Sequence, residues 1–272
     1  MILSRGGGHM LRLGVVQMAV LEGKVEENQK KIRNIVKKYA KDDIDLLCFP
    51  ELCISGYDFK QAEKSNRENE FFSEIAKEYH MAILAGIQVK DQEKYYDVSC
   101  VWDCEGNKLG QYRKIHLWDT ENDFFEKGEK LVTVSLKGWK IGMLICADYG
   151  FSEVSTILAQ DMGADVIIYP SAWAVGWQDL FSSCAKMRAV ENQIYTVALN
   201  RACGDVNYCG NTTVANPDGT ILLRLETVDE AYGRVVLEKE QLIKARQSIP
   251  WRKMKRNELY PKLKEKVNII KN

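Results

Sequence analysis

Three segments of the 272-residue sequence end an apolar run with a side chain suited to acid–base or nucleophilic chemistry. Glu51 directly follows the apolar run 45–50, Lys114 lies at the end of the run 108–115, and Cys146 ends the run 139–145. Ligands in α/β proteins tend to bind at the carboxyl ends of strands. A carboxylate placed there can act as a general base, a thiol as a nucleophile, and an ammonium as a partner for a developing oxyanion.

Each of these residues, taken alone, also has a simpler interpretation. Glu51 could be a solvated loop acid or a helix cap, Lys114 a charge on a solvated sheet edge, and Cys146 a small buried hydrophobe. The position of Cys146 at a strand-to-helix turn favours a nucleophile, because such a turn exposes the side chain and offers backbone N–H groups. A helix N-terminus would also lower the thiol pKa. Both interpretations stay open at this point.

Histidine is too scarce to serve as the obvious base. His9 belongs to residues 1–9, which have the composition of a cloning leader, and the native chain is expected to start at Met10. A Cys–His or Ser–His hydrolase would then have to use His80 or His116. We therefore expect that any base is not a histidine.

The cysteines do not predict a metal site. The spacings Cys100-x3-Cys104 and Cys203-x5-Cys209 lack the tight CxxC pattern of zinc ligands, and histidine ligands are nearly absent. No metal and no cofactor is expected. With no secretory signal, the eight cysteines are expected to be free thiols in a reducing cytoplasm.

Composition limits the class of partner. Lys+Arg and Asp+Glu both total 38, so the net charge is zero and no nucleic-acid partner is expected. No apolar run approaches the ~18 residues that cross a bilayer, so no membrane partner is expected either.

The apolar patterns predict alternating strands and helices. Strands are expected over residues 11–18, 45–50, 81–88, 95–104, 108–115, 131–136, 139–145, 165–170, 194–201, 212–216, 220–226 and 233–237. Helices are expected over residues 24–39, 70–79, 152–162 and 180–192. Several strand pairs are joined by short turns, which indicates a mixed sheet layered with helices and permits a two-sheet sandwich. One domain spans residues 10–272, with a basic extension over 239–272 that is expected to wrap a partner subunit.

Seven segments, in order and at compatible spacing, resemble the nitrilase superfamily of carbon–nitrogen hydrolases. The similarity covers essentially the whole chain after residue 9. The matching segments are Leu13–Met18, Phe49–Tyr57, Arg113–Trp118, Met143–Phe151, Gly163–Trp173, Met187–Arg201 and Gly210–Leu222.

The resemblance implies a catalytic triad of Glu51, Lys114 and Cys146, without a cofactor. It also implies a second acid upstream of an aromatic-x-x-Gly pattern that ends at Gly128. The spacing favours Glu121 over the competing Glu126 for that acid. These roles would form a thioester on the cysteine and hydrolyse a small-molecule amide.

The resemblance has further implications for the fold and the site. It implies a four-layer αββα sandwich of two mixed sheets flanked by helices, and a homodimer or larger homo-oligomer. The developing oxyanion would face Lys114 and the backbone N–H of Ala147. Trp118, Tyr149 and Trp173 are predicted to line the acyl pocket, with core packing as the alternative for each.

One residue departs from the family pattern. Many relatives carry an arginine four residues after the cysteine, where this sequence has Gly150. A guanidinium there could clamp a substrate carboxylate, so its absence favours a neutral or cationic amide. The alternatives within the family are a nitrilase acting on a C≡N bond and an N-carbamoyl amide hydrolase. The alternative from a different class is a non-catalytic binding module on the same fold.

Overall fold

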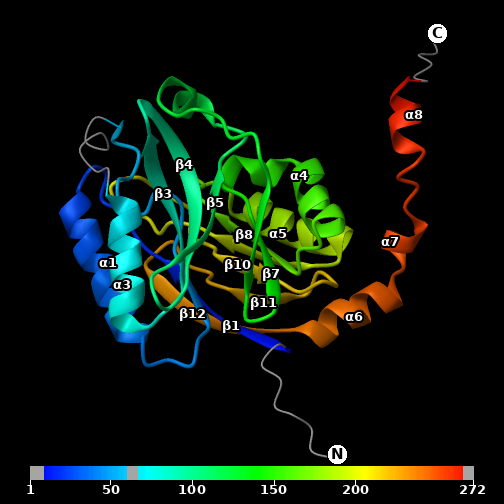
Figure 1. Ribbon diagram of the computed structural model, residues 1–272, viewed down its shortest axis with the longest axis horizontal. Coiled ribbons are helices and arrows are strands. Elements are labelled where there is room, and N and C mark those ends of the chain that lie inside the picture. Colours follow the sequence, from blue (N-terminus) through cyan, green and yellow to red (C-terminus); the bar gives the residue numbers. More distant parts are fainter. Residues whose placement is uncertain (1–8, 60–66, 266–272) are drawn as a thin grey trace, which may run out of the picture.

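The computed structural model describes residues 9–59 and 67–265. Over these residues the chain forms two six-stranded mixed sheets that pack face to face, with helices on the outer surfaces (Figure 1). The predicted four-layer αββα sandwich is confirmed.

The first sheet has the strand order β12-β1-β2-β3-β4-β5. Its strands are β1 (Met10–Gln17), β2 (Leu46–Cys48), β3 (Ile83–Asp91), β4 (Lys94–Trp102), β5 (Lys108–Arg113) and β12 (Ala231–Glu238). The second sheet has the order β11-β10-β9-β8-β7-β6. Its strands are β6 (Val132–Leu136), β7 (Trp139–Met143), β8 (Val166–Pro170), β9 (Tyr195–Leu199), β10 (Thr213–Ala215) and β11 (Ile221–Arg224).

The two sheets share one pairing pattern. Strands β1, β2 and β3 run parallel in the first sheet, as β7, β8 and β9 do in the second. Antiparallel strands flank each parallel set on both sides. Parallel strands buried on both faces read as continuous apolar runs, which is why residues 45–50 and 165–170 show no alternation.

Alternate side chains of the first sheet pack against different layers. In β1, Leu11, Leu13 and Val15 belong to the core shared with the second sheet. Val16, one residue on, belongs instead to the cluster under helices α1 (Val25–Tyr39) and α3 (Glu68–Tyr79). Side chains alternate along a strand, so one strand can cover both cores.

The outer helices follow the expected amphipathic patterns. Helix α1 buries Ile32 and Val36 and carries acidic residues in its first turn and basic ones in its last, which suits the helix dipole. Helix α5 (Gln178–Asn192) covers the second sheet beside α4 (Ser152–Thr156). The single helix predicted over 152–162 is wrong in one respect, since α4 continues as a π-helical turn over Ile157–Asp161.

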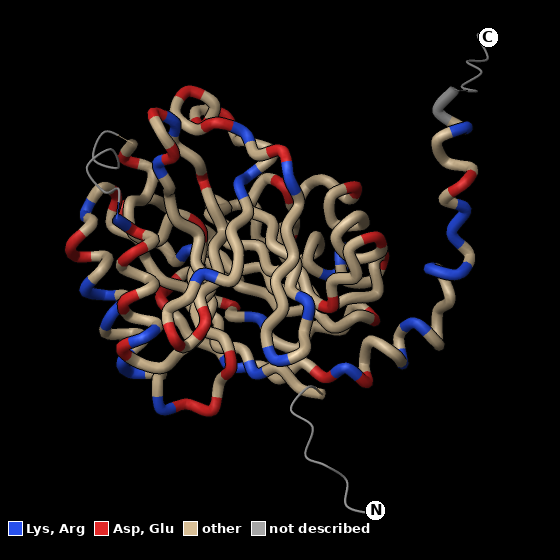
Figure 2. The backbone as a smooth tube through the Cα atoms, in the orientation of Figure 1, with Lys and Arg blue, Asp and Glu red and all other residues tan. Residues whose placement is uncertain are grey.

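The C-terminal extension begins against its own domain. Helix α6 (Lys239–Ser248) buries Leu242 and Ala245, and the Gln193 side-chain amide donates to the Ala245 carbonyl at 3.1 Å. Helices α7 (Trp251–Met254) and α8 (Tyr260–Glu265) then lead away from the two sheets (Figure 1). Lys and Arg predominate along this segment (Figure 2). Docking of the extension on a partner subunit stays a prediction.

Three other expectations concern the expected leader, membrane-spanning helices and the cysteines. Residues 1–8 of the expected leader lie outside the described residues. In the described part of the chain, no helix has the length and apolarity needed to span a bilayer. All eight cysteines carry free thiols.

Candidate active site

Both sheets contribute loops to one cluster of buried polar side chains. Glu51 lies in the loop after β2, and Lys114 directly follows β5 in the same sheet. Cys146 comes from the second sheet, three residues after the end of β7. The exposed fractions of Glu51, Lys114 and Cys146 are 0%, 0% and 8%.

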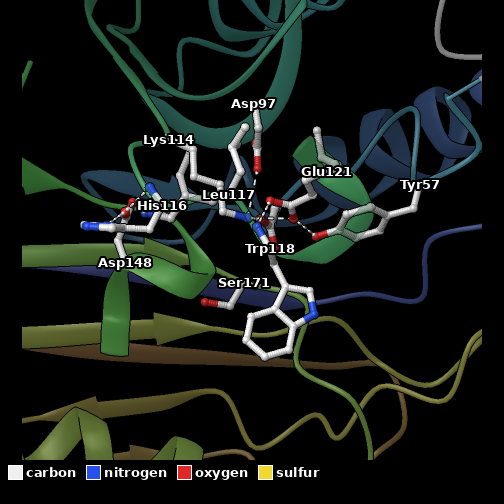
Figure 3. Close-up of polar contacts among 12 residues, drawn as sticks. Tyr57, Asp97, Lys114, His116, Leu117, Trp118, Glu121, Asp148 and Ser171 are labelled. Carbon is white, nitrogen blue, oxygen red and sulfur yellow. Dashed lines mark hydrogen bonds and ion pairs between the residues drawn. The ribbon is translucent and has the colours of Figure 1, made fainter. Parts of the chain in front are cut away.

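The Lys114 ammonium lies among three carboxyl groups. Its Nζ is 2.5 Å from Glu51 Oε1, 2.7 Å from Glu121 Oε1 and 3.3 Å from Asp97 Oδ2. Figure 3 shows two of these acids, Asp97 and Glu121, beside Lys114. The backbone of Lys114 is also fixed, since its N–H donates to the Asp97 carbonyl and its carbonyl accepts from the Gly128 N–H. A long flexible side chain is thereby held in one place.

These contacts set the charge of each group. Burial alone would raise the pKa of Glu51, but the positive charge of Lys114 and its hydrogen bond hold it below its ordinary value. Burial would lower the pKa of Lys114, yet the negative charge of Glu51 and its neighbours raises it well above its ordinary value. At neutral pH the pair is a carboxylate and an ammonium, so Glu51 can accept a proton.

The Cys146 thiol is protonated at rest. Burial, and after it the negative charge of Glu51, raises its pKa well above the ordinary value. The Lys114 charge and a hydrogen bond from the Ala172 backbone act in the opposite direction but are smaller. The expected lowering of the thiol pKa by a helix N-terminus is therefore wrong, because only the short helix η2 (Cys146–Gly150) follows and burial dominates.

The backbone at Cys146 is strained. Its φ is +39°, in the left-handed region that non-glycine residues rarely adopt. Leu52, the residue after Glu51, has a φ of +44°. Strained residues of this kind cluster at functional sites, where the surrounding structure holds a side chain in a required position.

Glu121, and not Glu126, lies in the cluster. Glu121 belongs to the short helix η1 (Asp119–Asp123) and accepts hydrogen bonds from the Tyr57 hydroxyl at 3.1 Å and the Trp118 N–H at 2.8 Å. Glu126 is exposed and pairs with Lys94. Burial raises the pKa of Glu121, and the Lys114 charge offsets this only in part.

The three acids could in principle hold a cation. One carboxylate oxygen from each of Glu51, Asp97 and Glu121 lies within 4.8 Å of the others. The Lys114 ammonium, however, already contacts all three groups at 2.5–3.3 Å. The donor set is that of a lysine site, and a metal ion would have to displace the ammonium.

Sequence reasoning missed two buried residues that contact this cluster. Asp97 lies on β4 and has no exposed surface. Arg201 follows β9, and its guanidinium donates to the Glu51 and Leu52 carbonyls, each at 2.9 Å. Arg201 also lies over the ring of Tyr57, with its Cζ 4.9 Å from the ring centroid. Only the polarity of Asp97 within an apolar strand could have drawn attention to it.

Asp148 links the turn after β7 to the loop after β5. Its carboxylate accepts hydrogen bonds from the Tyr112 hydroxyl at 2.6 Å and the Ile145 N–H at 3.0 Å. The His116 N–H and ring nitrogen contact the other oxygen at 3.1 and 2.7 Å. One buried carboxylate thus fixes the segments that carry Lys114 and Cys146.

The three predicted pocket residues do not form one wall. Tyr149 is fully buried, and its hydroxyl donates to the Phe181 carbonyl at 3.3 Å, as expected of core packing. Trp173 is half-buried and packs edge-on against Tyr149. Trp118 is 68% exposed, and over residues 9–59 and 67–265 no ring contact joins it to either. Substrate contact by Trp118 and Trp173 stays a prediction, while the position of Tyr149 gives that role no support.

Comparison with known proteins agrees with this fold. The carbon-nitrogen hydrolase family profile matches residues 12–245. A probable nitrilase of Schizosaccharomyces pombe is 32% identical over 80% of this chain and 85% of its own. An (R)-stereoselective amidase of a Pseudomonas species is 30% identical over 90% of this chain and 92% of its own. A Saccharomyces cerevisiae structure assigned to branch 10 of the nitrilase superfamily superposes with a TM-score of 0.83 at 25% identity, covering 91% of this chain and 97% of its own.

The chain belongs to the carbon-nitrogen hydrolase family of the nitrilase superfamily. The family predicted from the seven segments is confirmed. The protein is a hydrolase of carbon–nitrogen bonds. The comparisons do not assign catalytic roles to Glu51, Lys114, Cys146 or Glu121.

Proposed function

We propose that this protein hydrolyses a small neutral or cationic amide to an acid and ammonia or an amine, through a thioester on Cys146. The observation that carries the proposal is the buried cluster in which the Cys146 thiol lies together with Glu51 and Lys114, whose Nζ and Oε1 are 2.5 Å apart. The directions of the pKa shifts agree with a protonated thiol and an ionised Glu51. A thiol that is protonated at rest needs a base, and a buried carboxylate held by one cation is such a base.

In the first half of the reaction, the Cys146 proton passes to Glu51 as the sulfur attacks the amide carbon. The C–S bond forms, and the carbonyl oxygen becomes an oxyanion that faces the Lys114 ammonium and the Ala147 N–H. The C–N bond then breaks, and the leaving amine takes the proton from Glu51. The acyl group remains on Cys146 as a thioester.

In the second half, water attacks the thioester carbon and gives a proton to Glu51 or Glu121. The C–S bond breaks, the acid leaves, and the proton returns to the sulfur. Glu121 is suited to hold the water, because hydrogen bonds from Lys114, Tyr57 and Trp118 fix the orientation of its carboxylate. One water is consumed, and no oxidant, reductant or cofactor takes part.

The relative named an amidase supports amide over nitrile hydrolysis, although the relative named a probable nitrilase keeps the second candidate open. A panel of short amides and the matching nitriles, assayed for ammonia release, tests the choice. We expect release from amides, loss of activity in Cys146→Ala and full activity in the control Cys184→Ala. Ammonia release from nitriles alone, or full activity in Cys146→Ala, contradicts the proposal.

The substrate charge rests on Gly150. The residue is exposed, and no atom lies within 4 Å of the position that a Cβ would take, so a longer side chain fits there. We expect Gly150→Arg to raise kcat/KM for an amide that bears a distal carboxylate, about tenfold or more relative to an uncharged analogue. Gly150→Gln is the neutral control. A wild-type preference for the carboxylate-bearing amide would contradict the proposed preference for a neutral or cationic substrate.

We also propose a homodimer or larger homo-oligomer and a cytoplasmic location, with the exposed helices α7 and α8 as the segment that contacts a partner subunit. Sedimentation of the full chain and of a chain ending after residue 249 tests the proposed oligomer. A monomeric full chain would contradict it.

A further inference from the structure

Too many acids surround Lys114 for all of them to be ionised. Glu51, Asp97 and Glu121 are 0%, 0% and 2% exposed, and each lies within 3.3 Å of the one ammonium. Buried like charges at this separation cannot all persist, so at least one of these carboxyl groups holds a proton.

The second nearby cation does not relieve this excess. Arg201 donates to the Glu51 and Leu52 carbonyls and forms its ion pair with Glu22 at 2.9 Å. The groups whose charges act on Glu51 or respond to it come from several loops and strands. They are Lys114, Asp97, Glu121, Arg201, Tyr57, Cys146 and Tyr208.

Hydrogen bonding distinguishes the three acids. Glu121 accepts from three donors, and Glu51 Oε1 accepts from Lys114 at 2.5 Å. In contrast, both Asp97 oxygens and Glu51 Oε2 are buried without a hydrogen-bond donor among the described residues. Among the described residues, the Asp97 carboxyl group has only the 3.3 Å ion-pair contact with Lys114. The unpartnered oxygens of Asp97 and Glu51 are satisfied together if one of the two carboxyl groups carries a proton and donates it to the other.

We propose that Asp97 is a positioning residue that stays protonated and donates its hydroxyl to Glu51 Oε2, which orients Glu51 and keeps it ionised. Burial raises the pKa of Asp97 well above its ordinary value, in agreement with this assignment. The inference rests on the proposed function, in which Glu51 is the base.

Asp97 acts through Glu51 and does not touch the reacting atoms. A neutral donor stabilises the carboxylate of Glu51 without adding the charge that would repel it. An ionised Asp97 would do the reverse, because its charge would favour the protonated form of Glu51. The two possibilities predict opposite shifts of the acid limb of the pH–activity profile.

Asp97→Asn and Asp97→Leu, with Ser99→Ala as the control, separate these possibilities. Ser99 is buried on the same face of β4, and its hydroxyl lacks a hydrogen-bond partner in the described chain. We expect Asp97→Asn, which keeps a neutral donor of the same shape, to leave kcat and the pH of the acid limb unchanged. Leu should lower kcat and move the acid limb to higher pH by about one unit, with KM unchanged. Ser99→Ala should change neither.

A shift of the acid limb to lower pH in both Asp97 variants would overturn the proposal, because it would identify Asp97 as ionised. So would an unchanged profile in a folded Asp97→Leu. If the leucine variant does not fold, the infrared difference between wild type and Asp97→Asn decides. A protonated-carboxyl band lost in the variant supports the proposal, and its absence in the wild type overturns it. This readout needs no substrate, so it stands apart from failure of the proposed function, which Cys146→Ala reports.

Discussion

The Tyr112 hydroxyl and the Asp148 carboxylate, which belong to opposite halves of the sandwich, are joined by a buried hydrogen bond of 2.6 Å. The same hydroxyl accepts the Ile115 N–H at 3.1 Å. Asp148 in turn accepts the Ile145 N–H, next to Cys146. A chain of three hydrogen bonds therefore connects the backbone beside Lys114 to the backbone beside Cys146.

Tyr112→Phe removes the middle of this chain. We expect it to lower the free energy of unfolding by about 1–3 kcal/mol, because the buried Asp148 oxygen and the Ile115 N–H each lose a partner. It should also lower kcat. Tyr195→Phe is the matched control, since the Tyr195 hydroxyl likewise donates one hydrogen bond and accepts one. It donates to the Glu238 carbonyl and accepts the Glu238 N–H. Urea denaturation should show a comparable loss in the free energy of unfolding for both variants. The amidase assay should show a lower kcat only for Tyr112→Phe.

Gly86 on β3 supports the backbone of Glu51. A Cβ at Gly86 would lie 2.5 Å from Glu51 Cα and 2.9 Å from the Pro50 carbonyl oxygen. Gly86→Ala should therefore displace the loop that carries Glu51, the proposed base, at a cost of about 1–3 kcal/mol in stability and with a large loss of kcat.

Gly142→Ala is the control for this substitution. Gly142 lies on β7 in the other sheet, and its Cβ would approach only side chains, with Ile167 Cγ1 nearest at 3.1 Å. Those side chains can shift, so activity should be retained. Equal kinetic losses in the two variants would show that the contact of Gly86 with Glu51 is not what matters.

Lys114→Met leaves three buried carboxyl groups without their cation. We expect loss of activity and a loss of about 3–5 kcal/mol in stability at pH 8. Without the ammonium, the folded-state pKa of Glu51 should rise above its unfolded value, and those of Asp97 and Glu121, already raised, should rise further. A raised acid pKa costs stability above that pKa, and the cost disappears as the pH falls toward the unfolded value. The deficit relative to wild type should therefore shrink between pH 8 and pH 5.

Lys31→Met is the surface control for the lysine. Lys31 pairs with Glu230 at 2.7 Å, and both side chains are partly exposed. Its loss should cost about 1 kcal/mol or less, with no dependence on pH over the same range. A deficit in Lys114→Met that stayed constant with pH would contradict the assignment of the buried charges.

Asp45 provides a prediction at lower pH. Burial alone would raise its pKa, but hydrogen bonds from Arg12 and Lys137 lower it to about 2. Because the folded pKa lies below the unfolded value, its stabilisation is present above about pH 4 and is lost as the pH falls through about 2. Asp45→Asn should cost on the order of 1–2 kcal/mol at pH 6, and the cost should vanish near pH 2. Asp43→Asn is the control, since Asp43 contacts the same arginine with a side chain that is 78% exposed.

The sequence was sufficient for the layers of the fold because its apolar periods are local properties. Residues 11–18 and 165–170 are short apolar runs rich in β-branched residues, and the amphipathic pattern of residues 24–39 gives α1 almost to the residue. The π-helical turn at Ile157–Asp161 was not predictable in this way, since it arises within an ordinary helical pattern.

The polar groups around the site were harder to predict. The alternation of β4 places Asp97 and Ser99 on one face of the strand, yet it does not reveal that the second sheet covers that face. Arg201 is 150 residues from the Glu51 carbonyl that it contacts, and no local pattern encodes such a pair. Catalytic roles for Glu51 and Cys146 are predicted only through the order of the seven motifs, since each residue alone has a simpler interpretation.

The placement of Glu51 in one sheet and Cys146 in the other has a consequence for the timing of folding. The thiol can meet its proposed base only after the two sheets have docked, and Arg201 must be in place to fix the Glu51 loop. Strand pairing within each sheet can precede that event. A half-folded or half-synthesised chain would therefore lack the proposed pair of nucleophile and base, and the recovery of the proposed amidase activity during refolding would report the docking of the two sheets.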